Sequence, residues 1–277
     1  IGLTGGNAEF FLTAEADAPR PPRARTAHKW SAGSVLVVGG SPGMTGAPLL
    51  AARSALHAGA GSVSIATPGG LQSIYAVAAP ELLNMAIGDG THFEGGDAAT
   101  IAAAAKRFDV LALGPGLGSG RSEFVAALLS EWNGPLLIDA DGLNGLDGPG
   151  ALAVRTAPVA VTPHAGEFSR LTGEEPDYRR AADLATATGA IVLLKGSPTF
   201  VMGRSRWVVT TGGPELATIG SGDVLTGFLA ALWARGLDAE TAARSAAYWH
   251  GRAGSLLAAR QTVTADALAL EVGKVAW

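Results

Sequence analysis

The chain has 277 residues, of which 48% are hydrophobic and 16% charged, and its formal net charge is −4. This length and apolar fraction allow one large folded core or two small ones, while the weak negative charge without a basic block argues against a nucleic-acid partner. The chain has no cysteine, which excludes disulfides, thiol catalysis and thiolate metal sites and fits a reducing cytoplasm. It contains no apolar run of about eighteen residues, so we predict no membrane span.

Residues 1–27 are predicted to be an irregular lead-in, followed by one domain over residues 28–277. The lead-in ends in a proline- and arginine-rich piece, residues 19–23, which is typical of a linker, with a plain flexible tail as the alternative. A basic region followed by a hydrophobic stretch is missing, so no signal peptide is predicted. The sequence also lacks an initial methionine, and we therefore expect a fragment of a longer protein or a trimmed chain.

The first predicted unit is a strand, a helix and a second strand. A β-branched apolar run at residues 34–40 ends in glycines, a loop follows at residues 41–46, and an alanine-rich helix over residues 47–58 precedes a strand at residues 62–67. The glycine-rich loop therefore lies at the carboxyl end of its strand, where open α/β sheets bind ligands. It matches neither the G-x-G-x-x-G dinucleotide fingerprint nor the Walker loop, so a tight connection without a ligand is the alternative.

Short apolar strands continue to alternate with helices along the rest of the chain. The further predicted strands are residues 109–113, 135–139, 158–162 and 191–194. The further predicted helices are residues 97–108, 121–132, 167–171, 177–188, 224–234, 239–259 and 264–271. Residues 200–202 and 206–210 flank a turn that contains glycine and are predicted to form a hairpin. This order of elements, with no long internal repeat and no second core, predicts a single doubly wound α/β domain.

Glycines or polar residues directly follow several of these strands. The loop of residues 114–118 again places glycines after a strand. Asp139, Asp141 and Asn144 follow the next strand, and they either hold Mg²⁺ through water or cap the following turn. The five histidines never fall at metal-ligand spacing, so no zinc site is predicted.

His164 and Lys195 also lie at predicted strand ends. His164 could donate a hydrogen bond to a phosphate or a carboxamide, although a lone histidine is more often structural. Lys195 precedes a glycine, a position that suits a cation in contact with phosphate. Tyr248 and Trp249 lie in the middle of a long predicted helix and are interpreted as packing residues.

The most informative stretch is Thr218 to Gly227, in which two glycines and a serine lead into Asp223 and an apolar helix. Glycines let the backbone approach a ligand closely, and a helix start offers free N–H groups and the positive end of a dipole to a phosphate. Asp223 could then orient or deprotonate a hydroxyl that attacks phosphorus. The alternative is a loop that only caps the helix, through Ser221 or Asp223. A carboxylate beside a positive dipole end is expected to favour its charged form and to be a weak base.

Six motifs occur together in a fixed order. They are VVGGSPGMTGAPLLAARSALHAGAG at 37–61, LGPGLG at 113–118, IDADGLN at 138–144, TPHAGEF at 162–168, LKGSPTF at 194–200 and ATIGSGDVLTG at 217–227. In this combination the chain resembles, over roughly residues 28–271, the ADP- or ATP-dependent NAD(P)H-hydrate dehydratase family of the ribokinase-like superfamily. The last motif alone marks only a ribokinase-like phosphoryl-transfer site, whereas thiamine-pathway kinases lack the TPHAGEF and GGSPGMTGA pieces together.

The resemblance implies a three-layer α/β/α fold with a mostly parallel central sheet, and a metabolite-repair activity. The substrate would be hydrated NADH or NADPH, with a hydroxyl at C6 of the nicotinamide ring. A phosphoryl group from ADP or ATP, with Mg²⁺, would be transferred to that hydroxyl, and elimination of phosphate would restore the dihydropyridine. The resemblance also implies a homo-oligomer such as a tetramer. Because such proteins are often fused to an N-terminal epimerase domain, the lead-in could be the end of that domain.

The resemblance also implies roles for individual residues. Those implied to contact the hydrate are Ala47, Gly116, His164 and Asp223, with Asp223 as the base. Those implied to bind the adenine nucleotide are Lys195, Gly196, Ser197, Pro198, Thr199 and Gly222. The N–H groups of Gly220 and Gly222 would form an anion hole for the transferring phosphoryl group. No residue is assigned to the metal.

Two other functions remain open on the sequence. A ribokinase-like kinase of a small alcohol, such as a thiamine precursor, would keep Asp223 and the anion hole but release a stable phosphorylated product. A non-catalytic adenine-nucleotide-binding module would bind nucleotide without turnover, although the full set of loop motifs argues against it. A dehydrogenase is disfavoured because the dinucleotide fingerprint is missing.

Overall fold

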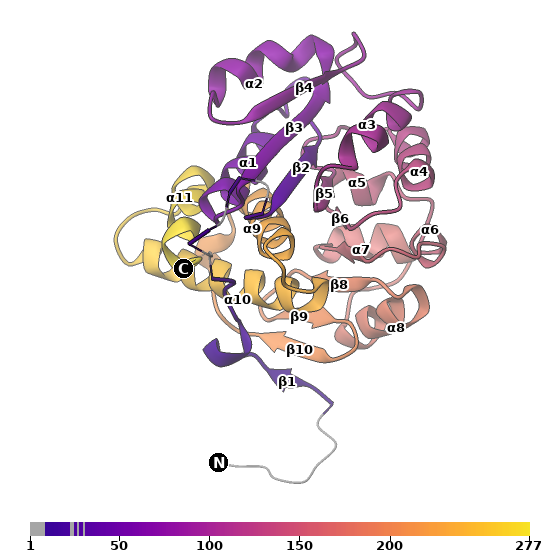
Figure 1. The fold of residues 1–277 in the computed structure, drawn as a ribbon. Coiled ribbons are helices and arrows are strands. Elements are labelled where there is room, and N and C mark those ends of the chain that lie inside the picture. Colours follow the sequence, from indigo (N-terminus) through magenta and orange to yellow (C-terminus); the bar gives the residue numbers. More distant parts are fainter. Residues whose placement is uncertain (1–8, 23–24, 27, 30) are drawn as a thin grey trace, which may run out of the picture.

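The computed structural model of the protein describes residues 9–22, 25–26, 28–29 and 31–277. Its strands are β1 (Phe11–Leu12), β2 (Ser34–Val38), β3 (Ser62–Pro68), β4 (Leu83–Ile87), β5 (Val110–Leu113), β6 (Leu136–Ile138), β7 (Val159–Val161), β8 (Ile191–Leu194), β9 (Thr199–Met202) and β10 (Arg206–Val209). They form one sheet in the order β1-β10-β9-β8-β7-β6-β5-β2-β3-β4 (Figure 1). Only β9 runs antiparallel to its neighbours, so the predicted, mostly parallel sheet is confirmed.

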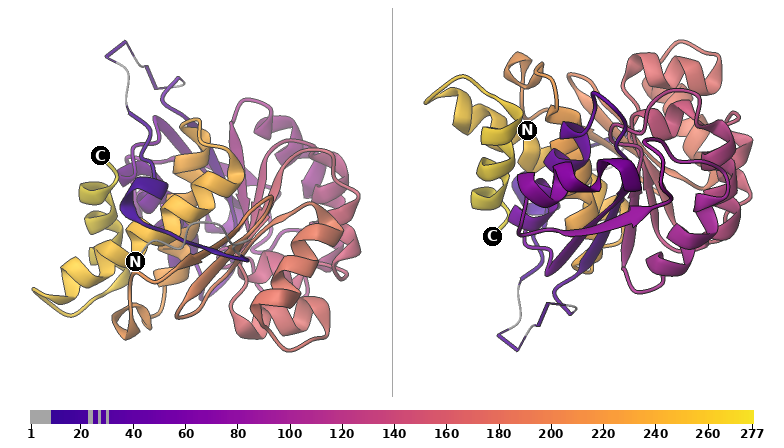
Figure 2. Two further views of the ribbon diagram at one scale, coloured as in Figure 1. Left: turned by 90° about the horizontal axis from the view of Figure 1, so that it is seen from below. Right: turned by 90° about the horizontal axis from the view of Figure 1, so that it is seen from above.

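Helices cover both faces of this sheet (Figure 2). The α-helices are α1 (Gly46–His57), α2 (Gln72–Ala78), α3 (Asp97–Ala105), α4 (Ser122–Glu131), α5 (Asp141–Asn144), α6 (Gly150–Ala153), α7 (Ala165–Thr172), α8 (Tyr178–Thr188), α9 (Ser221–Ala234), α10 (Ala239–Ala258) and α11 (Ala265–Val275). Short 3₁₀ turns lie at Glu15–Asp17, Gly69–Leu71 and Pro214–Leu216. In the described part of the chain, none of these helices has the length and apolar character needed to cross a bilayer.

The two faces of the sheet bury two separate apolar cores. Val35 and Val37 of β2 pack in a cluster with α1, α9, α10 and α11, whereas Leu36 and Val38 pack in a cluster with α3, α4, α7 and α8. A strand buried on both faces has no polar face, which explains why these runs are continuously apolar in the sequence. The doubly wound α/β architecture predicted from the sequence is therefore confirmed.

The direction of winding changes between β5 and β2. From β2 the chain proceeds outward to β3 and β4, and it then crosses to β5 on the other side of β2. Such a switch point leaves a crevice outside the carboxyl ends of the two strands between which the direction changes. The loops that follow β2 and β5 meet there, because Gly40 N donates to Pro115 O at 3.1 Å and a Cβ on Gly39 would lie only 2.0 Å from that oxygen.

Helix α9 passes through the more extensive of the two cores, and every residue from Val224 to Trp233 is buried. It packs closely on α1, where Gly227 faces the Ala51 carbonyl oxygen. A Cβ added to Gly227 would lie 1.9 Å from that oxygen, so only glycine allows the two backbones to come this close. This contact fixes the depth of α9 in the molecule and with it the position of Asp223 in its first turn.

Most predicted elements are confirmed with ends shifted by a few residues, but the short helices α2, α5 and α6 and the edge strands β1 and β4 were not predicted. Helix α2 and strand β4 lie between residues 68 and 96, where no element was assigned from the sequence. Because β4 is only partly buried, it lacks the continuous apolar run that identified the inner strands. Helix α11 continues to Val275, because Leu268, Val272 and Val275 pack into the core.

Part of the predicted lead-in packs against the domain. The two-residue strand β1 extends the sheet beside β10, a pairing that no local pattern signals. Trp249 is buried, as predicted, and its Nε1 donates to Ala18 O at 2.8 Å, while Arg244 Nε donates to Asp17 O at 2.6 Å. Residues 1–8, 23–24 and 27 of the lead-in lie outside the described residues, and the domain boundary at residue 28 stays a prediction.

We expect Gly227→Ala to destabilise the protein by roughly 3 kcal/mol, because the added methyl forces α9 away from the α1 backbone. Urea unfolding followed by circular dichroism measures this change. The control is Gly150→Ala in α6, where no atom lies within 4 Å of an added Cβ, and its stability should stay within about 0.5 kcal/mol of wild type. Equal stability of the two variants would contradict the assigned α1–α9 packing.

Candidate active site

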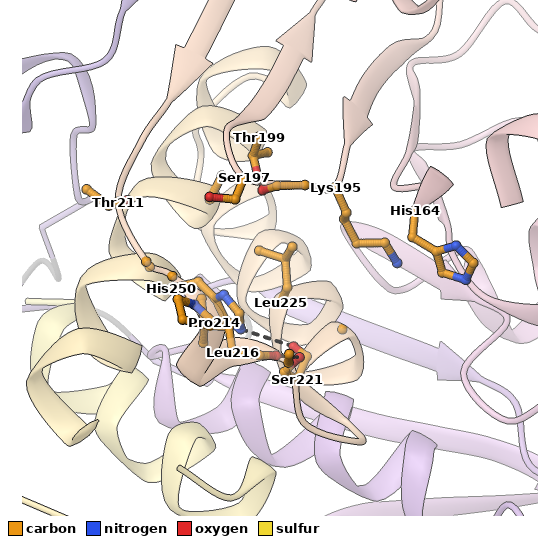
Figure 3. Close-up of a pocket in the computed structure, with 17 residues that line it drawn as sticks. His164, Lys195, Ser197, Thr199, Thr211, Pro214, Leu216, Ser221, Leu225 and His250 are labelled. Carbon is orange, nitrogen blue, oxygen red and sulfur yellow. Dashed lines mark hydrogen bonds between the residues drawn. The ribbon is translucent and has the colours of Figure 1, made fainter. Parts of the chain in front are cut away.

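A cavity of about 580 Å³ lies beside the start of α9 (Figure 3). Its walls come from residues 195–199 after β8, residues 211–217 after β10, the first turns of α9 and the middle of α10, with His164 beside Lys195. This volume lies in the range of small-molecule and cofactor sites and is adequate for a nucleotide. The segments that line it are far apart in the sequence, and the fold of the sheet brings them together.

The start of α9 has no side-chain cap. Gly220 is the N-cap residue, with a φ of 88°, and no side chain accepts a hydrogen bond from the first turn. Ser221 Oγ instead donates to Leu216 O at 2.7 Å. The alternative in which Ser221 or Asp223 caps this helix is therefore wrong. Uncapped N–H groups at the positive end of a long helix form an anion-binding site.

Lys195 lies at the carboxyl end of β8 between two acidic side chains. Its Nζ is 2.8 Å from Asp139 Oδ1 and 3.5 Å from Glu167 Oε2. Burial opposes the charge of this ammonium, but the two carboxylates outweigh burial and raise the pKa of Lys195 above its ordinary value. Burial likewise opposes the charge of Asp139, but Lys195 lowers the pKa of Asp139 below its ordinary value. Lys195 and Asp139 therefore form an ion pair in the wall of the site.

The side chain of Asp223 is partly buried and has no hydrogen-bond or ion-pair partner among the residues that the structure describes. Burial raises the pKa of Asp223 from 3.8 to about 7, and the negative charge of Asp139 adds to this effect, while Lys195 opposes it. The prediction that Asp223 is a weak base with a favoured charged form is therefore wrong. The sequence located Asp223 at the helix start, but it did not reveal the burial or the neighbouring carboxylate that override the dipole. A carboxylate with a pKa near 7 is suited to general-base catalysis.

Ala47 and Gly116 lie together on the other side of this helix start, in the crevice between β2 and β5. A Cβ on Gly116, which has a φ of 59°, would lie 3.2 Å from Ala47 Cβ and 2.3 Å from Met44 O. The same part of α1 reaches the α9 start, because a Cβ on Gly220 would meet Leu50 Cδ1 at 2.5 Å. Neither Ala47 nor Gly116 lines the cavity. Asp223 thus lies between two regions, the cavity and the crevice.

From the sequence, His164 was expected either to be structural or to contact a ligand, and its position is compatible with both. Its Nδ1 accepts from Gly166 N at 3.0 Å and from Glu167 N at 3.3 Å, and Glu167 Oε2 accepts from His164 N at 2.8 Å, so the two residues cap α7 reciprocally. The ring is half exposed and also lines the cavity. Nε2 lies 3.4 Å from Glu167 Oε1, so both ring nitrogens have partners within α7, and capping holds the imidazole in place with its exposed part at the cavity.

The three residues considered as metal ligands are all engaged elsewhere. Asp139 is paired with Lys195, Asp141 Oδ2 accepts from Gly118 N at 2.9 Å, and Asn144 Oδ1 accepts from Arg170 Nε at 2.8 Å. Among the described residues no group of three or more histidines and acids is placed to hold a metal ion. The side chains present therefore do not form a Mg²⁺ site by themselves.

The sequence analysis missed two residues of this site. Thr226, one turn after Asp223, donates from Oγ1 to Asp139 Oδ2 at 2.6 Å. His250, in the buried part of α10, lines the cavity, and its Nε2 lies 3.0 Å from Ser221 O. Spacing on α9 could have indicated Thr226, since residues three apart share a helix face. The only indication of His250 in the sequence was that a histidine occurs within a mostly apolar helix.

Comparison with known proteins identifies relatives over nearly the whole chain. The family model described as NAD(P)H-hydrate dehydratase matches residues 35–274. The bifunctional NAD(P)H-hydrate repair enzyme Nnr of Moorella thermoacetica is 38% identical over 278 residues, which cover 92% of this chain and 50% of that protein. The ADP-dependent (S)-NAD(P)H-hydrate dehydratase of Xanthomonas campestris pv. campestris is 36% identical over 261 residues, which cover 90% of this chain and 89% of that protein. The chain thus spans about half the length of the bifunctional relatives that it matches.

A solved structure shares the fold at similar coverage. The ADP/ATP-dependent NAD(P)H-hydrate dehydratase from Bacillus subtilis, co-crystallised with ATP/Mg²⁺, is 29% identical, with a TM-score of 0.81 over 98% of each chain. The ribokinase-like fold implied by the resemblance is also confirmed by a solved member of that superfamily.

We expect Asp223→Asn to stabilise the protein in a pH-dependent manner. The carboxyl pKa is about 7 in the folded protein and near 3.8 in the unfolded chain, so wild type loses stability as the pH rises from about 4 to 7 and the amide variant does not. The stability difference should be near zero at pH 4 and reach a few kcal/mol above pH 7.5. Urea unfolding over this pH range measures it, and a difference that does not vary with pH would contradict the raised pKa.

Proposed function

This chain belongs to the NAD(P)H-hydrate dehydratase family, and on that premise we propose that it is an enzyme that converts NAD(P)H hydrate back to NAD(P)H at the expense of ADP or ATP. The observation that carries the proposal is the position and protonation of Asp223. This partly buried carboxyl lies at an uncapped helix start, between a cavity adequate for a nucleotide and the crevice at the switch point of the sheet. From this position it would contact the reacting groups of two substrates.

The cavity is proposed to hold the phosphoryl donor. Its phosphates would meet the N–H groups of Gly220 and Gly222 at the α9 start, and residues 195–199 would form the opposite wall, with Pro198 contributing through its backbone. Because the Lys195 ammonium is already paired with two carboxylates, the helix start supplies most of the attraction for the anion. Mg²⁺ usually binds through phosphates, water and one or two carboxylates, so here the nucleotide would carry the ion.

The crevice is proposed to hold the nicotinamide end of the hydrate, against Ala47 and Gly116, with His164 in contact from the cavity side. Asp223 would accept the proton of the C6 hydroxyl as its oxygen bonds to the terminal phosphorus of the donor and the donor's P–O bond breaks. The C6–O bond would then break with departure of phosphate, and loss of a proton from the neighbouring ring carbon would restore the double bond. The helix start stabilises the charge that develops on the phosphoryl oxygens.

Three further features are proposed from the family alone. We expect a homo-oligomer such as a tetramer, a cytoplasmic location, and a dehydratase domain over residues 28–277. In a full protein with an N-terminal epimerase domain, residues 1–27 would be the end of that domain or the linker that follows it. The bifunctional relatives, which are about twice as long as this chain, support this expectation.

Wild-type protein should restore reduced-nicotinamide absorbance from NADH hydrate in the presence of Mg²⁺ and either ADP or ATP. Asp223→Asn should lose roughly a thousandfold in rate, because the amide cannot accept the proton. The matched control is Asp183→Asn at an exposed position of α8, which should keep the wild-type rate. A stable phosphorylated product would instead indicate a small-alcohol kinase. Nucleotide binding without turnover would indicate a non-catalytic nucleotide-binding module.

The rate of the chemical step should rise with pH and level off above about pH 7, because only the ionised form of Asp223 accepts a proton. Single-turnover recovery of NADH between pH 5.5 and 8.5, with both substrates saturating, measures this profile. Parallel measurement of ADP affinity separates loss of binding from loss of the base. A rate that is constant over this range would show that Asp223 does not act as a base with a raised pKa.

A further inference from the structure

His250 is a buried side chain in the cavity wall that the proposed reaction does not use. It belongs to α10, is 6% exposed, and lines the cavity beside the start of α9 (Figure 3). Its Nε2 lies 3.0 Å from the carbonyl oxygen of Ser221, in the first turn of α9. The imidazole is therefore fixed next to the expected phosphate site by a bond to the same helix.

This bond determines the protonation of the ring. A carbonyl oxygen can only accept, so Nε2 carries the hydrogen and donates it to Ser221. Burial lowers the pKa of His250 to about 4, which keeps the ring neutral near pH 7. Nδ1 then has a free lone pair, and no donor in the described part of the chain bonds to it. A lone pair in a buried ring favours a ligand that can donate to it.

The chemistry of the neighbouring groups restricts that ligand. A phosphate oxygen is an acceptor, so it would be repelled by Nδ1 rather than bound to it. Part of the cavity wall is formed by the loop of residues 211–217. This loop packs directly on α10 beside His250, because a Cβ on Gly212 would lie 2.8 Å from Gly251 Cα. This region lies next to the phosphate end of the cavity, where the sugar and base of a bound nucleotide would extend.

We propose that His250 is a specificity residue of the nucleotide site, whose Nδ1 accepts a hydrogen bond from a hydroxyl or amino group in the nucleoside half of the phosphoryl donor. The Nε2–H bond to Ser221 selects the tautomer that makes this possible. The proposal rests on the proposed function for the identity of the donor. The two groups of an adenine nucleotide that can donate in this way are the ribose hydroxyls and the exocyclic amine of the base.

Three substitutions separate the two nitrogens of the ring. In His250→Asn the amide oxygen can replace Nδ1, while the bond to Ser221 is lost. In His250→Gln the amide nitrogen can replace Nε2, while the Nδ1 acceptor is lost. His250→Leu removes both. Circular dichroism and thermal melting establish that each variant is folded before ligands are compared.

The test is calorimetric titration of wild type and variants with ADP and three analogues, 2′-deoxy-ADP, 3′-deoxy-ADP and inosine diphosphate, all with Mg²⁺. One analogue lacks the group that donates to Nδ1 and should bind wild type about tenfold more weakly than ADP, because a buried acceptor is left unpaired. The identity of that analogue assigns the donor to one ribose hydroxyl or to the base amine. The ratio of the affinity for ADP to the affinity for that analogue is the discrimination. It should be unchanged in His250→Asn and should fall to about one in His250→Gln and His250→Leu.

Discrimination that persists in both His250→Gln and His250→Leu would overturn the proposal, as would equal binding of all four ligands by wild type. These outcomes leave the proposed dehydratase activity untouched, since recovery of NADH is measured separately. Wild-type protein that bound no ADP would overturn both proposals. A uniform loss of affinity for every ligand in all three variants, with the discrimination unchanged, would assign His250 a purely structural role and would also overturn the proposal.

Discussion

The ammonium group of Lys195 lies between two buried carboxylates, 2.8 Å from Asp139 and 3.5 Å from Glu167. Lys195 and Asp139 follow the carboxyl ends of β8 and β6, the two strands on either side of β7, and Glu167 belongs to α7, which follows β7. Removal of one member of such a buried group leaves an uncompensated charge, which typically costs several kcal/mol. The ion pairs therefore hold the loops of this sheet edge in one arrangement, and Thr226 connects them to α9 through its bond to Asp139.

The same cluster sets the chemistry of Asp223. A helix dipole stabilises a nearby carboxylate by roughly 0.3 to 2 kcal/mol. The rise in the pKa of Asp223 from 3.8 to about 7 corresponds to roughly 4 kcal/mol in the opposite direction. Burial and the negative charge of Asp139 therefore outweigh the dipole and the positive charge of Lys195. A partly buried carboxyl that is neutral below pH 7 and ionised above it can remain without a partner and still accept a proton.

Helix α9 separates the cavity from the crevice because its start lies at the edge of both. On one side its first turn forms part of the cavity, and on the other its N-cap residue touches α1 near the crevice that follows β2 and β5. Close backbone contacts produce this arrangement, since side chains at Gly220 or Gly227 would collide with Leu50 or with the Ala51 carbonyl. The glycines of the last motif thus serve packing, and the proposed anion binding would restrict the same few positions.

The sequence by itself determined the strands buried on both faces, the helices between them, the doubly wound α/β class and the positions of Asp223, Lys195 and His164 at element ends. These features depend on continuous apolar runs, glycines and helix starts, which are local and can be recognised in a single chain. Only the tertiary structure decided that β1 and β4 complete the sheet, that Asp139 pairs with Lys195, that His250 faces the cavity and that the pKa of Asp223 is raised. Each of these depends on residues far apart in the chain, because burial and the distance between charges are properties of the packed fold and not of any one segment.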